Sequence, residues 1–203
     1  MDFIEKIRIN EYISYWKDSK EPLSANVGIV VGKDYHWIFD VGSHPEIPKK
    51  LVGERNKVIL SHFHPDHCEN LDEVLYEELY VGKNTYGYTH KGIIVEKEIT
   101  MMDGDLKVSI LPIPSSHAKG SLGMEINDTY LFLGDATYAT RKAGKVAYNT
   151  QQLLALIRLL ESRKAQYVLL SHQEPFLQKK EVEVTRLKMI YETRVQGEAY
   201  IEV

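Results

Sequence analysis

The sequence predicts a sheet-rich α/β sandwich formed by a single domain over residues 1–203. Most of the first half of the chain consists of short apolar segments bounded by polar residues, which is typical of buried strands. Helical periodicity is clearest in the second half, and glycine and proline are spread evenly, so no linker divides the chain. A chain of 203 residues buries enough surface to form a core without disulfide bonds.

The elements expected in the first half are mainly strands. Residues 25–32 and 35–40 are apolar runs on either side of a short polar turn, a pattern that predicts a β-hairpin. Residues 57–60 form a third strand of the buried type. Residues 70–78 carry leucine and valine at helical spacing, so we expect a helix there.

Strands continue into the second half and then alternate with two helices. The further strands that we expect span residues 92–100, 106–113, 121–126, 129–133 and 166–170, with a turn at Asn127-Asp128. Residues 150–163 have the apolar face of a helix, with Asn149 or Thr150 as the N-cap. Residues 181–196 have a second such face, which is followed by the stop signal Gly197.

The overall charge of the chain is mildly acidic. Lysine and arginine number 25 against 29 aspartate and glutamate residues, which gives a formal net charge of −4. This excess argues against a nucleic-acid binder that relies on bulk positive charge. The N-terminal residues lack the apolar core of a signal peptide, no stretch approaches 18 apolar residues, and there is one cysteine. We therefore expect a cytoplasmic protein that does not bind membranes.

The eight histidines of the chain are unevenly distributed. Four ligand-type side chains, His62, His64, Asp66 and His67, fall within six residues directly after a predicted strand. In extended backbone, residues i and i+2 point to the same side, so His62 and His64 can bind one metal ion. Pro65 changes the direction of the chain, so that Asp66 and His67 can face a second point. Burying four such groups without a cation would be costly, and the segment therefore predicts a metal site.

Three more candidate ligands follow later in the chain. His117, Asp135 and His172 each lie at the C-terminal end of a predicted strand. The ends of strands along one edge of a sheet are where α/β folds gather the residues of a site. We therefore expect these three side chains to join the histidine cluster.

Taken together, these segments resemble the metallo-β-lactamase-fold hydrolases. The segment His62-Phe-His-Pro-Asp-His67 matches the HxHxDH motif of that family. Further similarities follow the family's order over residues 25–175: Ile38-Phe-Asp-Val-Gly42, Pro114-Ser-Ser-His-Ala-Lys-Gly-Ser121, Leu133-Gly-Asp135 and Leu170-Ser-His172. The resemblance implies a four-layer αββα sandwich with the site at one edge.

The resemblance also implies a role for each ligand. It assigns His62, His64 and His117 to a first metal ion, Asp66, His67 and His172 to a second, and Asp135 to a bridge between the two. Asp40 is implied as the residue that supports the ligand loop. Two departures from the family pattern are Cys68-Glu69-Asn70, where Gly-Gly is frequent, and Ala118-Lys119-Gly120, where Thr-Pro-Gly is frequent. Neither departure removes a ligand.

This set of ligands favours a dinuclear metal-dependent hydrolase. Mixed histidine and aspartate ligation favours two divalent zinc ions, although iron and manganese use the same ligands. Two metal ions about 3.5–4 Å apart lower the pKa of a bridging water and polarise the bond under attack. We expect a metal-bridging hydroxide, oriented by Asp66, to attack a small ester, thioester or lactone.

Other side chains bear on the substrate. Tyr138, three residues after the bridging aspartate, resembles a tyrosine of the lactonase branch that contacts the substrate carbonyl. We hypothesise that it stabilises the oxyanion or gives a proton to the leaving group. Segment 138–149, which we expect to be a loop, carries the cations Arg141, Lys142 and Lys145. These cations and Lys119 either contact an anionic substrate or are merely solvated.

Several alternatives remain open at this level. The same ligands suit a phosphodiesterase, an iron-dependent persulfide dioxygenase or a non-catalytic metal-binding module. In iron-dependent oxygen reductases of this family a glutamate replaces the second histidine of the motif, so His64 argues against that branch. The expected partner is a small-molecule substrate, and the oligomeric state is not determined. We expect Cys68 to be a small buried residue, and His36, His44 and His90 to be ordinary surface or strand residues.

Overall fold

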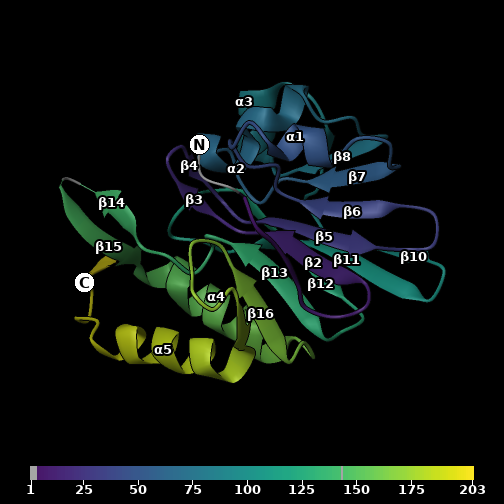
Figure 1. The fold of residues 1–203 in the computed structure, drawn as a ribbon. Helices are drawn as coiled ribbons and strands as arrows, with labels where there is room; N and C mark the ends of the chain where they lie inside the picture. Colours follow the sequence, from purple (N-terminus) through teal and green to yellow (C-terminus); the bar gives the residue numbers. More distant parts are fainter. Residues whose placement is uncertain (1–3, 143) are drawn as a thin grey trace.

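The computed structural model describes residues 4–142 and 144–203, and for Lys142 it describes only the backbone. Two β-sheets face each other, and helices cover the outer face of each sheet (Figure 1). The described residues therefore form four layers in the order α, β, β, α, which confirms the αββα sandwich expected from the sequence.

The first sheet is built from the N-terminal half of the chain. Its spatial order is β1 (Lys6–Arg8), β2 (Ile13–Trp16), β5 (Val27–Val31), β6 (His36–Phe39), β7 (Asn56–Ile59), β8 (Glu78–Val81) and β9 (Ile93–Ile94). Strands β1, β2, β5 and β6 pair antiparallel, whereas β6 to β9 pair parallel. The C-terminal ends of β6 and β7 therefore lie side by side at one edge.

The second sheet follows in the chain and lies beneath the first in Figure 1. Its spatial order is β10 (Ile99–Asp103), β11 (Leu106–Ile113), β12 (Ser121–Ile126), β13 (Tyr130–Gly134), β16 (Tyr167–Leu170) and β17 (Leu177–Lys179). Only β13 and β16 pair parallel in this sheet, so their C-terminal ends also lie side by side.

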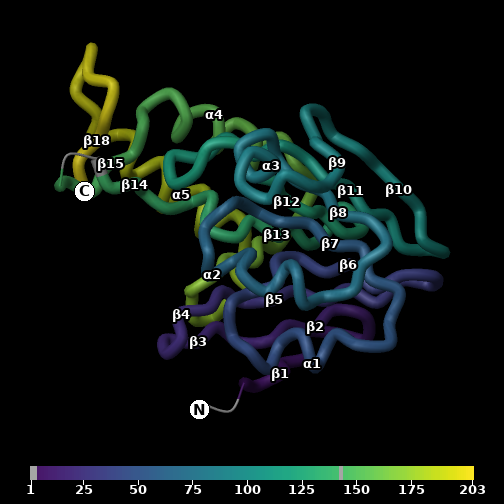
Figure 2. The backbone as a smooth tube through the Cα atoms, turned by 90° about the horizontal axis from the view of Figure 1, so that it is seen from above, coloured from purple at the N-terminus to yellow at the C-terminus, as the bar shows by residue number. Residues whose placement is uncertain are grey.

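The remaining elements of the described residues are short strands, a 3₁₀ turn and five α-helices. The helices are α1 (Ile47–Lys50), α2 (Pro65–Cys68), α3 (Lys83–Thr89), α4 (Thr150–Ser162) and α5 (Lys180–Glu192). Two small sheets consist of β3 (Ser19–Lys20) with β4 (Leu23–Ser24), and of β14 (Thr140–Lys142), β15 (Lys145–Asn149) and β18 (Tyr200–Glu202). The latter sheet projects from one side of the sandwich (Figure 2). Among the described helices, none has the length and apolar character required to cross a bilayer.

Apolar side chains fill all three spaces between the four layers. Along β6, Trp37 and Phe39 face the second sheet, where Phe39 lies against Phe132 with ring centroids 5.5 Å apart. Between them, Ile38 faces the opposite way and packs with Ile47 of α1. The outer face of the second sheet packs against α4 and α5 in the same manner. Strands buried on both faces therefore appear in the sequence as continuous apolar runs.

Several predicted elements are confirmed. Strands β5 and β6 form the expected hairpin. Asn127 and Asp128 both adopt φ of 51°, a left-handed conformation that asparagine and aspartate tolerate in turns. Helix α4 covers the predicted span, and the Asn149 side chain caps it by accepting a 3.0 Å hydrogen bond from the Gln152 amide.

The helix predicted over residues 70–78 is wrong. A single 3₁₀ turn, Glu69–Asp72, is followed by irregular chain, and strand β8 begins at Glu78. Leu71 and Val74 are buried against the first sheet, whereas Leu75 is 71% exposed. The apolar spacing therefore reflects the packing of one turn and not a helical face.

Three further boundaries differ from the prediction. Residues 92–100 contain two strands that belong to different sheets, β9 and β10, because the chain crosses between the sheets here. Helix α5 ends at Glu192 and not at residue 196, and Val195 is exposed. Segment 138–149 is a β-hairpin that β18 extends, and not a loop. The short strands β1 to β4 were not predicted.

Candidate metal centre

The HxHxDH segment forms a ligand loop, residues 60–68, directly after β7. His64 is extended, with φ of −69° and ψ of 141°, and Pro65 begins the short helix α2. Proline suits the first helical position because its φ is already fixed near the helical value. The extended part therefore presents His62 and His64, and the helical turn presents Asp66 and His67, as the sequence predicted.

The structure brings all seven predicted ligands together. Their ligand atoms form three groups, within each of which the atoms lie no more than 4.8 Å apart. The groups are His62, His64 and His117; Asp66, His67 and His172; and His62, His67 and Asp135. The first two groups are the two sets that the sequence resemblance implied.

Close contacts define the interior of the centre. His117 Nε2 lies 3.0 Å from His64 Nδ1, and His172 Nε2 lies 3.0 Å from Asp66 Oδ2. Asp135 Oδ2 lies 3.4 Å from both His67 Nε2 and His117 Nε2. One carboxylate therefore faces ligands of both groups, which is the position of a bridge.

The donor atoms fit divalent metal ions. Among the described residues, the buried atoms without a hydrogen-bond partner include Nε2 of His62, Nε2 of His67 and Oδ1 of Asp135. Buried polar atoms are normally paired, and lone pairs that converge without a donor are costly unless a cation binds them. Nitrogen and carboxylate oxygen are ligands that zinc accepts.

The pKa values of the histidines differ because their neighbours differ. Burial, together with the adjacent imidazoles of His67 and His64, holds the pKa of His62 far below its ordinary range. Burial likewise lowers the pKa of His64, and His117 adds to the effect. Burial also acts to lower the pKa of His67, but Asp40 and Asp135 outweigh it and raise that pKa to about 10. The carboxylates of Asp40 and Asp135 thus stabilise the positively charged form of the His67 imidazole.

Asp40 and Ser61 orient the ligand loop from behind. Asp40, at the end of β6, accepts hydrogen bonds from the Ser61 amide (2.7 Å), the Ser61 hydroxyl (2.8 Å) and His67 Nδ1 (2.8 Å). A carboxylate only accepts, so the Ser61 hydroxyl points at Asp40, and its oxygen is left to accept from His62 Nδ1 at 2.9 Å. Both imidazoles therefore turn their Nε2 lone pairs toward the centre.

Asn70 fixes the chain that follows the ligand loop through hydrogen bonds. Its side-chain amide donates to the Val41 and His44 carbonyl groups at 3.1 and 3.0 Å, and its backbone amide donates to Gly42. The Val41 and Gly42 amides in turn donate to the His67 carbonyl. The sequence reasoning missed both Asn70 and Ser61, although Ser61 stands next to His62.

The second sheet delivers its ligands close to this loop. Gly134, immediately before Asp135, has φ of +55°, and a Cβ there would lie 2.7 Å from the Ser61 side chain. Glycine therefore permits the approach of the two sheets at this point. The amide of Ser171 donates to the Gly134 carbonyl, and the amide of His172 donates to the Asn26 side chain at 3.0 Å.

Tyr138 lies beside the centre, with its ring centroid 6.1 Å from that of His117. Its hydroxyl donates to the carbonyl group of Ser171, the residue before His172. Burial raises the pKa of Tyr138, so the phenol is protonated at neutral pH. The predicted contact with a substrate carbonyl would require the Ser171 bond to be exchanged for the substrate.

The predicted basic residues lie in different surroundings. Lys119 is exposed in the His117 loop, and Arg141 is exposed on β14. Lys145 pairs with Glu202 of β18 at 2.7 Å, so this lysine stabilises the small sheet. The side chain of Lys142 lies outside the described residues, as does Ala143.

The remaining histidines and Cys68 only partly follow the prediction. Cys68 is buried as expected, its Sγ lies 3.3 Å from the His64 carbonyl oxygen, and burial raises the pKa of its thiol to about 12. His36 lies 3.7 Å from Glu54, and His90 is exposed at the end of α3. His44 is fully buried and is not an ordinary surface residue, because it packs behind the ligand loop.

A cavity of about 760 Å³ reaches the first group of ligands. This cavity, which we call the His117 groove, is lined by residues that include Phe63, Asn84, His117, Lys119, Gln152 and Tyr200. Gly120, which lines the groove, touches the backbone of a second loop, since a Cβ on Gly82 would lie 1.7 Å from the Gly120 carbonyl oxygen. The sequence did not predict the groove, because its walls come from α3, the His117 loop, α4 and β18.

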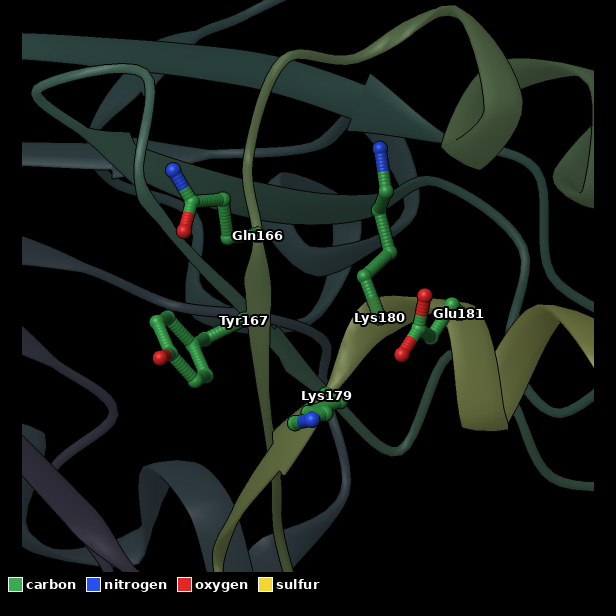
Figure 3. A pocket seen from close by; sticks show the side chains of 5 residues that line it. All are labelled: Gln166, Tyr167, Lys179, Lys180 and Glu181. Atoms are coloured by element: carbon green, nitrogen blue, oxygen red, sulfur yellow. The ribbon is translucent and has the colours of Figure 1, made fainter.

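A smaller cavity of about 340 Å³ lies at the opposite end of β16, away from His172 (Figure 3). Gln166 and Tyr167 extend to one side of it and Lys180 to the other. The Lys180 amine donates to the Arg163 carbonyl group. The polar side chains do not converge there, so this cavity is not a second candidate site.

Comparison with known proteins supports the fold independently. No protein-family model and no curated protein sequence matches the chain. A metallo-β-lactamase from Pontibacter korlensis superposes with a TM-score of 0.71 at 16% identity, over 95% of this chain and 100% of that protein. A flavo di-iron protein variant from Thermotoga maritima gives a TM-score of 0.72 at 14% identity, over 97% of this chain and 63% of that protein.

These likenesses cover nearly all of the chain, at identities too low to transfer an activity. Proteins that are named for a β-lactamase and for a di-iron centre share the architecture. The four-layer arrangement of the sheets and helices agrees with these comparisons. The chain therefore has the metallo-β-lactamase fold.

Proposed function

We propose that this protein is a dinuclear metal-dependent hydrolase that acts on a small ester, thioester or lactone. The observation that carries the proposal is the arrangement of two three-ligand groups around one shared carboxylate, Asp135. Two metal ions held by a common carboxylate are typical of hydrolytic centres. A structural role for the metal would not require an accessible cavity beside the ligands.

The ligand set supports zinc in both positions. His62, His64 and His117 would hold one ion, and Asp66, His67 and His172 the other. When bound, such ions lower the pKa of a water molecule and polarise the bond that is to be cleaved. The residues around them then determine orientation and proton transfer.

Asp66 is the residue best placed to orient the attacking water. Burial acts to raise its pKa, but the hydrogen bond from His172 and the nearby charges of His67 and His172 together outweigh burial and keep the pKa below its usual range. The carboxylate is thus ionised at neutral pH, and one oxygen already faces His172. We assign to its other oxygen the orientation of the attacking water.

Iron is the main alternative metal, because a di-iron protein shares the fold. An iron centre with the same ligands would favour persulfide dioxygenation, and a phosphodiesterase would use the same two zinc ions. His64 supports the zinc hydrolase over the oxygen reductases, for which the sequence resemblance implies a glutamate at this position.

Metal analysis combined with a substrate panel tests the proposal. Protein purified without added metal is analysed by mass spectrometry and is then assayed with a lactone, a thioester and a bis-aryl phosphodiester. We expect two zinc ions per chain and turnover of the lactone or the thioester. One iron per chain with oxygen consumption on a persulfide would overturn the hydrolase, and exclusive turnover of the phosphodiester would overturn the substrate class.

A further inference from the structure

Two cavities of different charge are each lined by one residue of the metal centre. The His117 groove is lined by His117 of the first group. A second cavity of about 510 Å³, which we call the Asp66 groove, is lined by Asp66 of the second group together with Glu69 and Glu73. A substrate arm that extends from the centre past His117 therefore enters the first cavity.

The charges of the two cavities are opposite in sign. Among the described residues that line the His117 groove, Lys119 is the only lysine or arginine and none is acidic. The described lining of the Asp66 groove has three carboxylates and no lysine or arginine. Since like charges repel, an anionic arm is favoured in the first space and disfavoured in the second.

The remaining lining of the His117 groove favours a polar chain that ends in an anion. Asn84 and Gln152 provide amide groups, and Phe63 provides an aromatic wall. Gln152 belongs to the first turn of α4, which carries no acidic residue, so the partial positive charge of that helix end adds to the charge of Lys119. Amide donors together with one flexible cation suit a carboxylate.

We propose that the substrate carries a carboxylate-bearing arm that lies in the His117 groove and is contacted by Lys119. This inference rests on the proposed hydrolase function and narrows its substrate class to esters, thioesters or lactones with one terminal carboxylate. Lys119 is a specificity residue that acts at a distance from the bond that is broken.

A pair of substrates matched in length tests the inference. Mono-4-nitrophenyl glutarate and 4-nitrophenyl pentanoate have the same acyl length and differ by a terminal carboxylate or methyl group. We expect the wild type to favour the glutarate in kcat/KM, mainly through KM. Lys119→Met should reduce this preference about fivefold, a modest effect because an exposed ion pair is weakened by solvent.

Two control variants distinguish the effect of the charge on Lys119 from the effect of the overall charge of the protein. Lys119→Arg should retain the preference, since it keeps the cation. Lys164→Met removes an equally exposed lysine beyond the end of α4 and should leave the preference unchanged. Loss of the preference in Lys164→Met, or its retention in Lys119→Met, would overturn the inference.

Binding measured by calorimetry keeps this inference distinct from the hydrolase proposal. Glutaramate and pentanamide are product-like amides that differ in the same terminal group, and both are titrated into the zinc-loaded protein. We expect glutaramate to bind more tightly, and Lys119→Met to remove the difference. If neither ester is hydrolysed, the hydrolase proposal fails, while calorimetry still decides whether the groove recognises a carboxylate. Equal binding of the two amides to the wild type would overturn the inference.

Discussion

The two halves of the sandwich contribute to the metal centre in different ways. The first half supplies four ligands from one loop of six residues, His62 to His67, held directly by Asp40 and indirectly by Asn70 through the backbone of Val41 and Gly42. The second half supplies His117, Asp135 and His172 from three separate strand ends. The geometry of the ligands from the first half is set locally, whereas that of the ligands from the second half depends on the whole sheet. Substitutions that disturb the support of the ligand loop should therefore reduce metal affinity, whereas substitutions that weaken the second sheet should reduce the free energy of unfolding.

The largest effect is expected at Asp135, the ligand through which the two halves meet. Asp135→Ala removes the shared carboxylate, so we expect kcat to fall by at least about 10³-fold and the metal content to fall below two ions per chain. Steady-state kinetics and metal analysis measure both quantities. Asp105→Ala, at an exposed turn between β10 and β11, is the control and should retain both metal ions. A fully active Asp135→Ala protein would falsify the bridged centre.

Asp40 tests the local support of the first half. Asp40→Asn keeps the shape and tolerates the φ of 61° at this position, but its amide cannot accept from both Ser61 and His67. We expect about a 100-fold loss of metal affinity in a competition with a chelator, because an outer hydrogen-bond partner of a ligand is removed. The control is Asp128→Asn, which has φ of 51° in a distant turn. Equal losses in the two variants would contradict a local role for Asp40.

Arg163 tests the global support of the second half. It follows α4 and binds Glu125 of β12 at 2.6 Å and Glu98 at 2.9 Å, and Glu125 is buried. Arg163→Met leaves that carboxylate without its partner and should reduce the free energy of unfolding by about 2 kcal/mol, as measured in urea. Metal affinity of the folded protein should change little. Arg158→Met, on the exposed face of α4, is the matched control.

The effect of Arg163 should also depend on pH. The hydrogen bond from Arg163 lowers the pKa of Glu98 below its ordinary value of 4.5. A group whose pKa is lowered in the folded state stabilises the protein above the unfolded value, and this contribution is lost as the pH falls through the folded pKa. The difference between the wild type and Arg163→Met should therefore shrink below about pH 4.5. A difference that grows on acidification would show that Glu98 is not part of the interaction.

The smallest effect is expected at Tyr138. Its hydroxyl already donates to the Ser171 carbonyl group, so its present contact holds the strand end that carries His172. Tyr138→Phe should lower kcat by less than tenfold, consistent with the loss of one hydrogen bond of about 1 kcal/mol. Tyr130→Phe, at the other end of β13, controls for loss of a hydroxyl elsewhere. A 100-fold decrease in kcat would show that the Tyr138 hydroxyl turns to the substrate during the reaction.

The same contrast between the halves explains what the sequence could predict. The ligand loop was evident because four ligands lie within six residues and because extended backbone alternates its side chains. The strand-end ligands were found only through the order of several short segments. Asn70 was missed because its partners, the carbonyl groups of Val41 and His44, become neighbours only in the folded chain.

Errors in the predicted elements have similar causes. The apolar spacing over residues 70–78 fits a helix locally, but Glu78 at the end of that segment begins strand β8 of the first sheet. The sequence of segment 138–149 predicts a loop and not the hairpin β14–β15, because β15 also pairs with β18, about 50 residues further along the chain. The His117 groove combines residues from Phe63 to Tyr200 and therefore has no signature within any one segment.

The contact between Gly82 and Gly120 affects how the substrate range of this protein can change. Because backbone touches backbone there, neither loop can move inward, and any side chain at Gly82 would force the His117 loop apart. The position of the groove wall at Gly120 is therefore set by the main chain. Selection for new substrates in the laboratory should therefore yield replacements at Lys119, Asn84 and Gln152, while Gly82 and Gly120 persist. Such replacements would change the chemistry of the His117 groove and leave its wall at Gly120 in place.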